Sequence, residues 1–233
     1  KVEFVLNSPA RTRSWWGVTV ALMSVLALLF GSFTVPATAK AQIVGAQAQY
    51  NSNVALQSGP DIEFDFEGNT GANVQSASLF PWTVQYDGRS ESFWAYCIEP
   101  SVALGNEGGT WSGKVVDSAQ YTGGENKLGS TNPEAKERAE KINWIVSNSY
   151  PHLSPAEMGF PNATIPDLVP ATAAAVWVIS ADATIDRSEL NDGQLAIFDY
   201  LMNNVKPLPM DSEYSGKFIQ SDAQDVVLVP PRN

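Results

Sequence analysis

The sequence predicts an α+β fold, in which an antiparallel β-sandwich or barrel carries a helical insertion. Apolar and polar residues alternate in segments between residues 61 and 98, and apolar residues then recur at helical spacing from residue 135 to 205. A short apolar run returns at residues 226–229. Strands on both sides of a block of helices are typical of this class. With 44% hydrophobic residues among 233, the chain can form a sizeable core.

The first strand is predicted at residues 61–67. Ile62, Phe64 and Phe66 share one face, and four acidic residues share the other. This is the pattern of a half-buried strand. Carboxylates that alternate along a strand point outward and are too widely spaced for a tight cation site. We therefore interpret the acidic face as a solvated surface.

A hairpin is predicted around Asp87-Gly88, because this dipeptide is typical of two-residue turns between alternating apolar runs. A strand that is apolar on both faces is expected in the middle of a sheet. The second strand of the hairpin has this pattern, which places Cys97 near the end of a central strand. Its two faces carry Phe93, Ala95 and Cys97 on one side, and Trp94, Tyr96 and Ile98 on the other.

Three helices are predicted in the second half of the chain. The first has Asn132 as its cap and ends before Pro151. The second begins at Pro170 and is apolar nearly all round, which puts position 173 in its first turn. The third has Asp192 as its expected cap. The expected buried stripes are Ala135, Ala139, Ile142 and Val146 in the first helix, and Leu195, Phe198, Leu201, Met202 and Val205 in the third.

The first 41 residues have the pattern of a secretory signal peptide. Arg11 and Arg13 precede an apolar stretch at 15–35, and Ala39-Lys40-Ala41 is a small-residue cleavage pattern. A membrane anchor is the alternative, since the stretch is about long enough to span a bilayer. In both cases the rest of the chain faces outward. The expected organisation is then a flexible lead-in over 42–60, the main domain over 61–229, and at 230–233 the start of a linker to stalk domains.

The chain is acidic, with 25 acidic and 14 basic residues and a formal net charge of −11. This argues against a nucleic acid or an anionic membrane surface as the partner, because both require a basic face. No glycine-rich run follows a strand and opens a helix, so no phosphate-binding loop is predicted. Cys97 and His152 are each the only residue of their kind and cannot supply a tetrahedral zinc site by themselves. We expect neither a metal nor a cofactor.

The role of Cys97 is open on residue type alone. A single cysteine cannot form an intramolecular disulfide, and free cysteine is commonly a buried apolar residue. A second possibility is the nucleophile of a secreted cysteine hydrolase, with His152 as the base. A carbohydrate-binding face is a further possibility, because three tryptophans lie in the β part, although core packing explains them equally well. These residues are Trp82, Trp94 and Trp111.

Three segments, taken in their order along the chain, indicate one of these roles for Cys97. They are Tyr96-Cys97-Ile98-Glu99, the helical stretch at 141–151, and Ala171-Thr172-Ala173-Ala174-Ala175-Val176-Trp177. Together they resemble the thioester domains of Gram-positive surface adhesins. The first is similar to the cysteine motif of that family, and the last to its second motif, Thr-Gln-x-Ala-aliphatic-Trp. The resemblance extends from about Phe64 to Val205.

The resemblance implies an internal thioester between the cysteine sulfur and the glutamine side chain, formed with loss of ammonia where the β part meets the helices. Such a domain attaches covalently to a lysine amine of a host-surface or extracellular-matrix protein, for example a fibrinogen-like target. The reaction occurs once per molecule, so the resemblance implies an adhesin and not an enzyme. It also implies a secreted protein on the bacterial cell surface, anchored to the wall through a region beyond residue 233.

The glutamine position of the second motif is occupied by Ala173. Alanine has no carboxamide, so the expected thioester cannot form with Cys97. Ala173 is either an engineered replacement or a natural one in a non-covalent adhesin module. Gln194 is an alternative acyl donor, but it lacks the preceding threonine and the following tryptophan. Because position 173 is expected in a first helical turn, we hypothesise that free N–H groups there would polarise the acyl carbonyl.

Overall fold

The computed structural model describes residues 42–66, 69–102, 110–124 and 126–232. The expected signal segment, residues 1–41, lies outside them. The strands are β1 (Gln47–Tyr50), β2 (Gln57–Phe66), β3 (Asn69–Tyr86), β4 (Arg89–Cys97), β5 (Ser112–Asp117), β6 (Thr184–Ile185), β7 (Lys217–Ser221) and β8 (Val226–Leu228). The helices are α2 (Ala135–Ser147), α3 (Ile165–Ala181) and α4 (Asp192–Asn204). None of these helices is long and apolar enough to cross a membrane.

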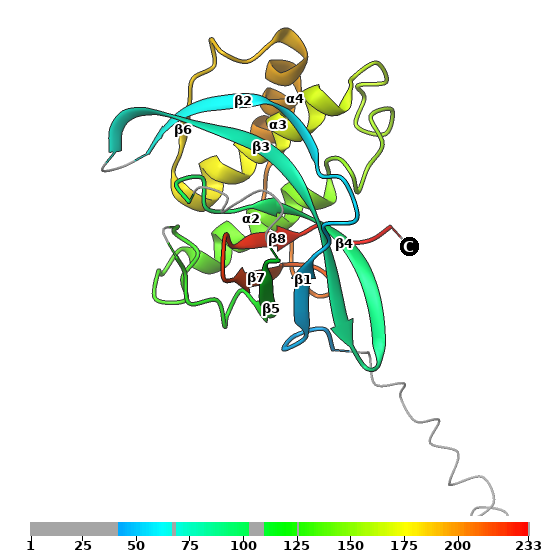
Figure 1. Cartoon of the computed structure of the whole chain (residues 1–233). Helices are drawn as coiled ribbons and strands as arrows, with labels where there is room; N and C mark the ends of the chain where they lie inside the picture. The colour runs from blue at the N-terminus through cyan, green and yellow to red at the C-terminus, as the bar shows by residue number, and fades with distance from the viewer. Residues whose placement is uncertain (1–41, 67–68, 103–109, 125, 233) are drawn as a thin grey trace, which may run out of the picture. The chain divides into compact units, whose positions relative to one another are not determined.

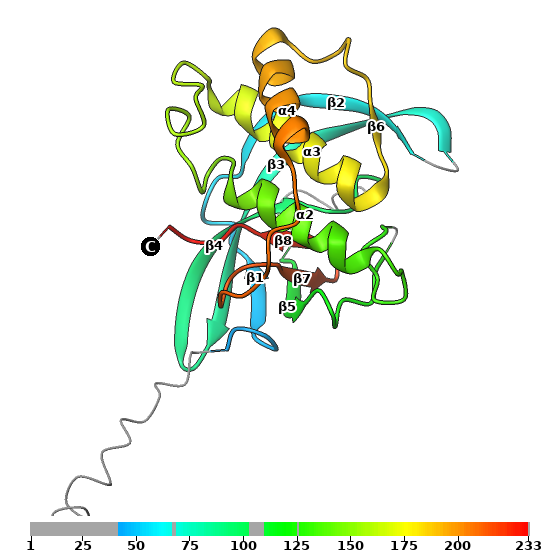
Figure 2. The same ribbon diagram turned by 180° about the vertical axis from the view of Figure 1, so that it is seen from behind.

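The strands form one antiparallel sheet that closes on itself. The order is β1-β5-β7-β8-β4-β3-β2-β6, and β1 also pairs with β3, which closes a barrel of six strands. The outer part of β3 continues past the barrel and pairs with β2, which in turn pairs with the short β6. The helices gather on one side of β2, β3 and β4 (Figures 1 and 2). The predicted α+β class, with an antiparallel barrel and a helical insertion, is confirmed.

The hairpin between β3 and β4 also agrees with the prediction. Tyr86 pairs with Arg89 across the turn, and Asp87 and Gly88 both have positive φ, 48° and 69°. Two successive positive φ values give the turn the backbone twist that adjacent antiparallel strands require. Glycine adopts this conformation without steric cost. β4 lies between β3 and β8 and is therefore central.

Two hydrophobic cores share β4. One fills the barrel and the other lies between the barrel wall and the helices. Alternation along β4 directs Ala95 and Cys97 into the barrel core, and Tyr96 into the helical core, which also receives Ile98 just after the strand. Each face of β4 therefore packs into a different core, which explains why the sequence of the strand is apolar on both faces.

The barrel begins earlier than the sequence indicates. The expected flexible lead-in contains β1, whose Ala48 is buried while Gln47 and Gln49 are exposed. Small side chains bury well inside a barrel, but they give little hydrophobic signal. β7 was not predicted either, although Phe218 and Ile219 are fully buried in it. In β2, Ile62 and Phe64 are buried as predicted.

The helix cores agree with the prediction better than the helix starts do. All four residues of the predicted stripe in α2 are buried, but the helix begins at Ala135, because Asn132 Oδ1 accepts from the Glu134 N–H at 3.0 Å in the preceding turn. α3 begins at Ile165 and not at Pro170, because Thr164 and Asp167 form a capping box there. In α4 the cap is Asn191, one residue before Asp192, which was the expected cap. Within the predicted stripe of α4, only Phe198 and Leu201 are buried.

A buried amide fixes the segment between α4 and β7 against α2. Asn143 is 1% exposed. Its Nδ2 donates to the carbonyls of Leu208 and Pro209 at 3.2 and 3.3 Å, and its Oδ1 accepts from the Gly216 N–H at 3.2 Å. Both ends of the amide therefore hold backbone groups of one connecting segment.

Replacing Asn143 with alanine should lower the free energy of unfolding by about 3 kcal/mol, because several buried backbone groups lose their partners. Denaturant titration measures this loss. Asn204→Ala is the control, since Asn204 is exposed and bonds only its own helix, at Tyr200 O. The control should cost less than about 1 kcal/mol. Equal losses for the two variants would contradict the prediction.

Candidate functional site

Cys97 is the last residue of β4 and is 3% exposed. Its neighbour across the ladder is Val226 of β8, and its side chain belongs to the barrel core. The Sγ atom accepts a hydrogen bond from the backbone N–H of Glu99 at 3.1 Å. The chain turns back over the sulfur immediately after the strand ends, so that the thiol is enclosed by its own motif.

Trp177 links helix α3 to the end of β4. The indole N–H of Trp177 donates to the carbonyl oxygen of Cys97 at 3.2 Å. Trp177 is 1% exposed and packs against the ring of Phe64, with centroids 5.3 Å apart. Ala173 precedes Trp177 by one helical turn, so the two residues share a face of α3. The site residues predicted from the sequence thus lie on elements that meet at the junction of barrel and helices.

A buried polar network lies beside the thiol. Its members are Glu99, Tyr121, Asn126, Gln224 and Asp225. The Tyr121 hydroxyl donates to Asp225 Oδ2 at 2.7 Å, and the Asp225 N–H donates to Glu99 Oε2 at 3.0 Å. Asn126 Nδ2 donates to the Tyr121 hydroxyl oxygen at 2.6 Å and to Glu99 Oε1 at 3.3 Å. Gln224 Nε2 donates to the Glu99 carbonyl at 3.1 Å. The network ties the residues after Cys97 to the turn before β8.

Sequence reasoning identified only Glu99 of this network, as part of the cysteine motif. Tyr121 and Asp225 lie 104 residues apart in the chain, so their contact cannot be read from spacing. The one sequence pattern that could have pointed to this network is an acidic residue next to the end of an apolar strand. Glu99 has this position after β4, and Asp225 has it before β8.

Burial raises the pKa of the Cys97 thiol well above its ordinary value. The Glu99 backbone N–H and the Trp177 indole act in the opposite direction, whereas the nearby Glu99 and Asp225 carboxyls raise the pKa further. Burial likewise raises the pKa of Asp225, against the lowering effect of its bonds from Ser221 and Tyr121. Cys97 is therefore a protonated thiol at neutral pH, and a poor nucleophile as it stands.

The hypothesis about free N–H groups at position 173 is wrong. Because α3 begins at Ile165, Ala173 lies in the middle of the helix, where each backbone N–H bonds to the preceding turn. The carbonyl freed inside α3 belongs to Pro166, since Pro170 has no N–H to donate to it. That carbonyl accepts from Gln194 Nε2 at 3.0 Å.

Gln194 is therefore engaged in a structural role. It is 2% exposed, and its Oε1 accepts from the Asn191 N–H at 3.0 Å as part of the capping box of α4. With its Nε2 bonded to Pro166, both ends of the carboxamide are used at the start of α4. This arrangement favours position 173 over Gln194 as the place of the acyl donor.

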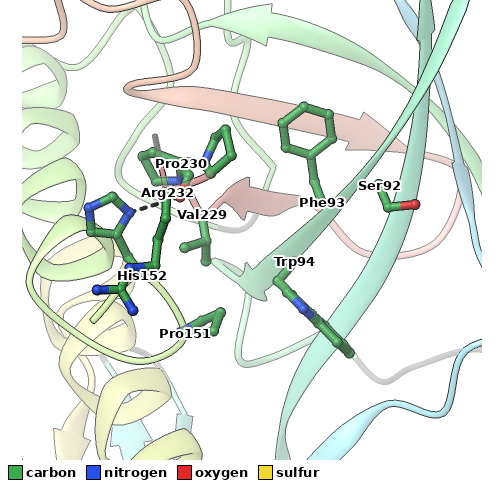
Figure 3. A pocket seen from close by; sticks show the side chains of 9 residues that line it. Ser92, Phe93, Trp94, Pro151, His152, Val229, Pro230 and Arg232 are labelled. Carbon is green, nitrogen blue, oxygen red and sulfur yellow. Dashed lines mark hydrogen bonds between the residues drawn. The ribbon is translucent and has the colours of Figure 1, made fainter. Parts of the chain in front are cut away.

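The structure does not bring His152 to Cys97. The imidazole Nδ1 lies 2.9 Å from the carbonyl oxygen of Pro230, and the ring lines a cavity of about 270 Å³ together with Trp94 and Arg232 (Figure 3). Cys97 is not among the lining residues of that cavity. The alternative of a Cys97–His152 dyad therefore finds no support among the described residues.

The tryptophans do not form one binding face. Trp82 and Trp111 are buried in the barrel core, whereas Trp94 packs on the other side of β4 against the helical core. The carbohydrate-binding alternative loses its basis, because a sugar platform requires aromatic rings exposed together. Within the described ranges, no group of three or more histidine, cysteine or acidic residues could hold a metal ion.

Residues 94–207 match the family model described as thioester domain. The matched stretch begins in β4, contains Cys97 and all three helices, and ends just after α4. This match agrees with the family that the two motifs indicated, the thioester domains of surface adhesins.

A solved structure is also similar, the N-terminal thioester domain of a surface protein from Clostridium perfringens. It has 14% sequence identity and a TM-score of 0.49, and the match covers 65% of this chain and 88% of that one. A search of curated protein sequences found no match.

Cys97 should react slowly with iodoacetamide in the folded protein. Because burial raises the pKa of the thiol and limits access to it, alkylation at neutral pH should be about a hundredfold or more slower than in denaturant. The rate should still rise with pH above the range of an ordinary thiol, near pH 8.5. Intact mass against time measures both rates, with Cys97→Ser as the blank. A folded protein that alkylates as fast as the unfolded chain would refute the assignment of a buried thiol.

Gln194→Leu should destabilise the domain by about 2–3 kcal/mol, because α4 loses its capping box and the Pro166 carbonyl loses its donor. Gln194→Glu keeps the acceptor for the Asn191 N–H and should cost less. The unmodified chain should have the full mass of its sequence, since Gln194 keeps its ammonia. A mass lower by one ammonia, restored in Gln194→Leu, would identify Gln194 as the acyl donor instead.

Proposed function

We infer that this is the host-adhesion domain of a secreted bacterial surface protein, built for covalent attachment through a thioester between Cys97 and a glutamine at position 173. With Ala173, the chain is a form that cannot make the bond. The observation that carries this proposal is the hydrogen bond from Trp177 to the Cys97 carbonyl. It ties the second motif to the cysteine motif, and position 173 is one helical turn away.

The chemistry follows from the two side chains. A glutamine at position 173 would supply the acyl carbon, and Cys97 would supply the sulfur while ammonia is released. A lysine amine then attacks the acyl carbon, the C–N bond forms and the C–S bond breaks. The sulfur keeps the electron pair and gains the proton that the amine loses, leaving an amide and a free thiol. The thiol is not regenerated as a thioester, so the domain acts once and is not an enzyme.

Burial supports this role. A thioester is reactive toward water, and the described site lies at a junction where Cys97, Ala173 and Trp177 are all at most 3% exposed. Exclusion of water from such a bond prevents its loss before a target is met. The same burial requires a target amine that enters the site, which favours a long side chain such as lysine.

The partner that fits this chemistry is a host-surface or extracellular-matrix protein with accessible lysines, fibrinogen-like by family resemblance. The net charge of −11 supports encounter with basic surfaces. We place the protein on the surface of a Gram-positive bacterium, held by the cell wall. No cofactor takes part in the proposed reaction.

A non-covalent adhesin module is the second candidate. It is supported by Ala173 itself and by the raised pKa of the buried Cys97 thiol, which fits a core residue. A cysteine hydrolase has less support, because the His152 imidazole contacts Pro230.

Ala173→Gln should lower the intact mass by one ammonia, and methylamine should then add to the protein and remove that deficit. Ala173→Gln with Cys97→Ser is the matched control and should keep its full mass. Incubation of the Gln variant with a lysine-rich host protein should give an adduct that survives denaturation. Full mass in a folded Ala173→Gln variant, with binding that dissociates on denaturation, would favour the non-covalent module.

A further inference from the structure

The segment that follows Cys97, residues 98–102, folds back over the sulfur and then reaches the surface. The backbone N–H of Glu99 in this segment donates to the Cys97 Sγ at 3.1 Å. The segment is buried as far as Pro100, whereas Ser101 and Val102 are half-buried. Only a few residues of chain therefore separate the buried sulfur from the surface at this end of β4.

The carboxamide of Gln224 holds this segment to the turn before β8. Gln224 is 2% exposed, and its Nε2 donates to the carbonyl oxygens of Glu99 at 3.1 Å and of Val102 at 2.7 Å. Both hydrogens of the amide nitrogen are then used. The Oε1 atom of the same carboxamide has no hydrogen-bond partner among the described residues. A buried acceptor without a donor costs free energy, so this atom indicates a place for a donor that comes from another molecule.

The groups gathered around this carboxamide accept hydrogen bonds, and two of them are carboxyl groups. The Glu99 carboxyl accepts from the Asp225 N–H at 3.0 Å. The Asp225 carboxyl accepts from the Tyr121 hydroxyl at 2.7 Å and from the Ser221 N–H at 2.8 Å, which are both neutral donors. An ammonium group brings three N–H donors and a positive charge. It therefore matches this set of groups better than a neutral molecule does.

We propose that the segment 98–102 and Gln224 form the receiving site for the ammonium group of the target lysine, with Gln224 Oε1 as an acceptor. The inference rests on the proposed function and names the groups that bring the amine to the cysteine end of the thioester. An ammonium at this place also competes with Gln224 Nε2 for the Glu99 and Val102 carbonyls. Its arrival therefore loosens the cover over the sulfur.

The proposed reaction balances with this binding step before it. The bound ammonium loses one proton to solvent and becomes the neutral amine. The amine attacks the acyl carbon, and the electron pair of the C–S bond moves to the Cys97 Sγ. The sulfur then takes the second proton that the nitrogen releases. The products are an amide and the Cys97 thiol.

The first measurement uses the chain with Ala173 and two thiol reagents that differ in charge. Aminoethyl methanethiosulfonate carries an ammonium group, and methyl methanethiosulfonate is neutral. Each forms a mixed disulfide with the cysteine and releases methanesulfinate. The rate for each reagent in the folded protein, followed by intact mass, is divided by its rate in denaturant. The ammonium reagent should be favoured by about tenfold or more in this ratio, because the acceptors beside Cys97 attract it.

Two variants of Gln224 and one control identify the source of this preference. Gln224→Leu removes the acceptor, so the preference should fall below about threefold, whereas Gln224→Glu keeps an oxygen there and should preserve it. Gln194→Leu is the matched control and should keep the preference despite its loss of stability. Gln194 is also 2% exposed and also donates through Nε2 to a backbone carbonyl, but it lies at the start of α4. Circular dichroism confirms that each variant folds.

Three outcomes of this experiment overturn the inference, whatever the mass of the Ala173→Gln variant proves to be. They are equal normalised rates for the two reagents in the folded chain, no labelling of the folded chain by either reagent, and a preference that survives Gln224→Leu or is lost in a folded Gln224→Glu variant.

The second measurement adds Ala173→Gln and compares two nucleophiles by intact mass. Methylamine is mostly protonated at neutral pH, and hydroxylamine is mostly neutral. Gln224→Leu should slow the addition of methylamine by about tenfold and that of hydroxylamine by less than about threefold. Equal slowing of both nucleophiles would show that Gln224 acts only through packing. Failure of Ala173→Gln to lose ammonia instead overturns the proposed function, so the two failures are read from different signals.

Discussion

The hydrogen bond from the Trp177 indole to the Cys97 carbonyl joins two parts of the chain that are 80 residues apart. It depends on three other features of the fold. The β3–β4 turn sets the register of β4, and pairing with β8 fixes the end of that strand. The capping box at Thr164 sets the start of α3, and with it the helix face that Trp177 and Ala173 share. A change in any of these would separate the two motifs even if every motif residue were kept.

The same junction determines the electrostatics of the sulfur. A thiol buried at the end of a barrel strand, beside Glu99 and Asp225, resists ionisation. A poor leaving group makes a thioester slow to react with water, which is useful for a bond that must wait for its target. It also makes reaction with the target slow. The Glu99 N–H that donates to Sγ lowers the pKa of the thiol, so burial and this hydrogen bond have opposite effects on one atom.

The sequence allowed good prediction of the features that depend on local periodicity. The Asp87-Gly88 turn, the central position of β4 and the buried stripe of α2 are of this kind. β1 could not be found, because its one buried residue is an alanine, Ala48. The predicted start of α3 is wrong, because Pro170 fits the first turn of a helix equally well, whereas the capping box formed by Thr164 and Asp167 sets the actual start. The Tyr121–Asp225 contact could not be found from local pattern at all, since closure of the barrel creates it.

The corrected start of α3 changes where assistance to the proposed reaction must come from. In a first turn, backbone N–H groups at position 173 would have been available to the acyl oxygen. In mid-helix they are bonded to the preceding turn, and the one carbonyl freed by Pro170 is satisfied by Gln194. The backbone of α3 therefore offers no donor to the acyl group at that position. The N–H group that reaches the Cys97 sulfur is the backbone N–H of Glu99, whereas the indole N–H of Trp177 is bonded to the Cys97 carbonyl and holds the backbone there.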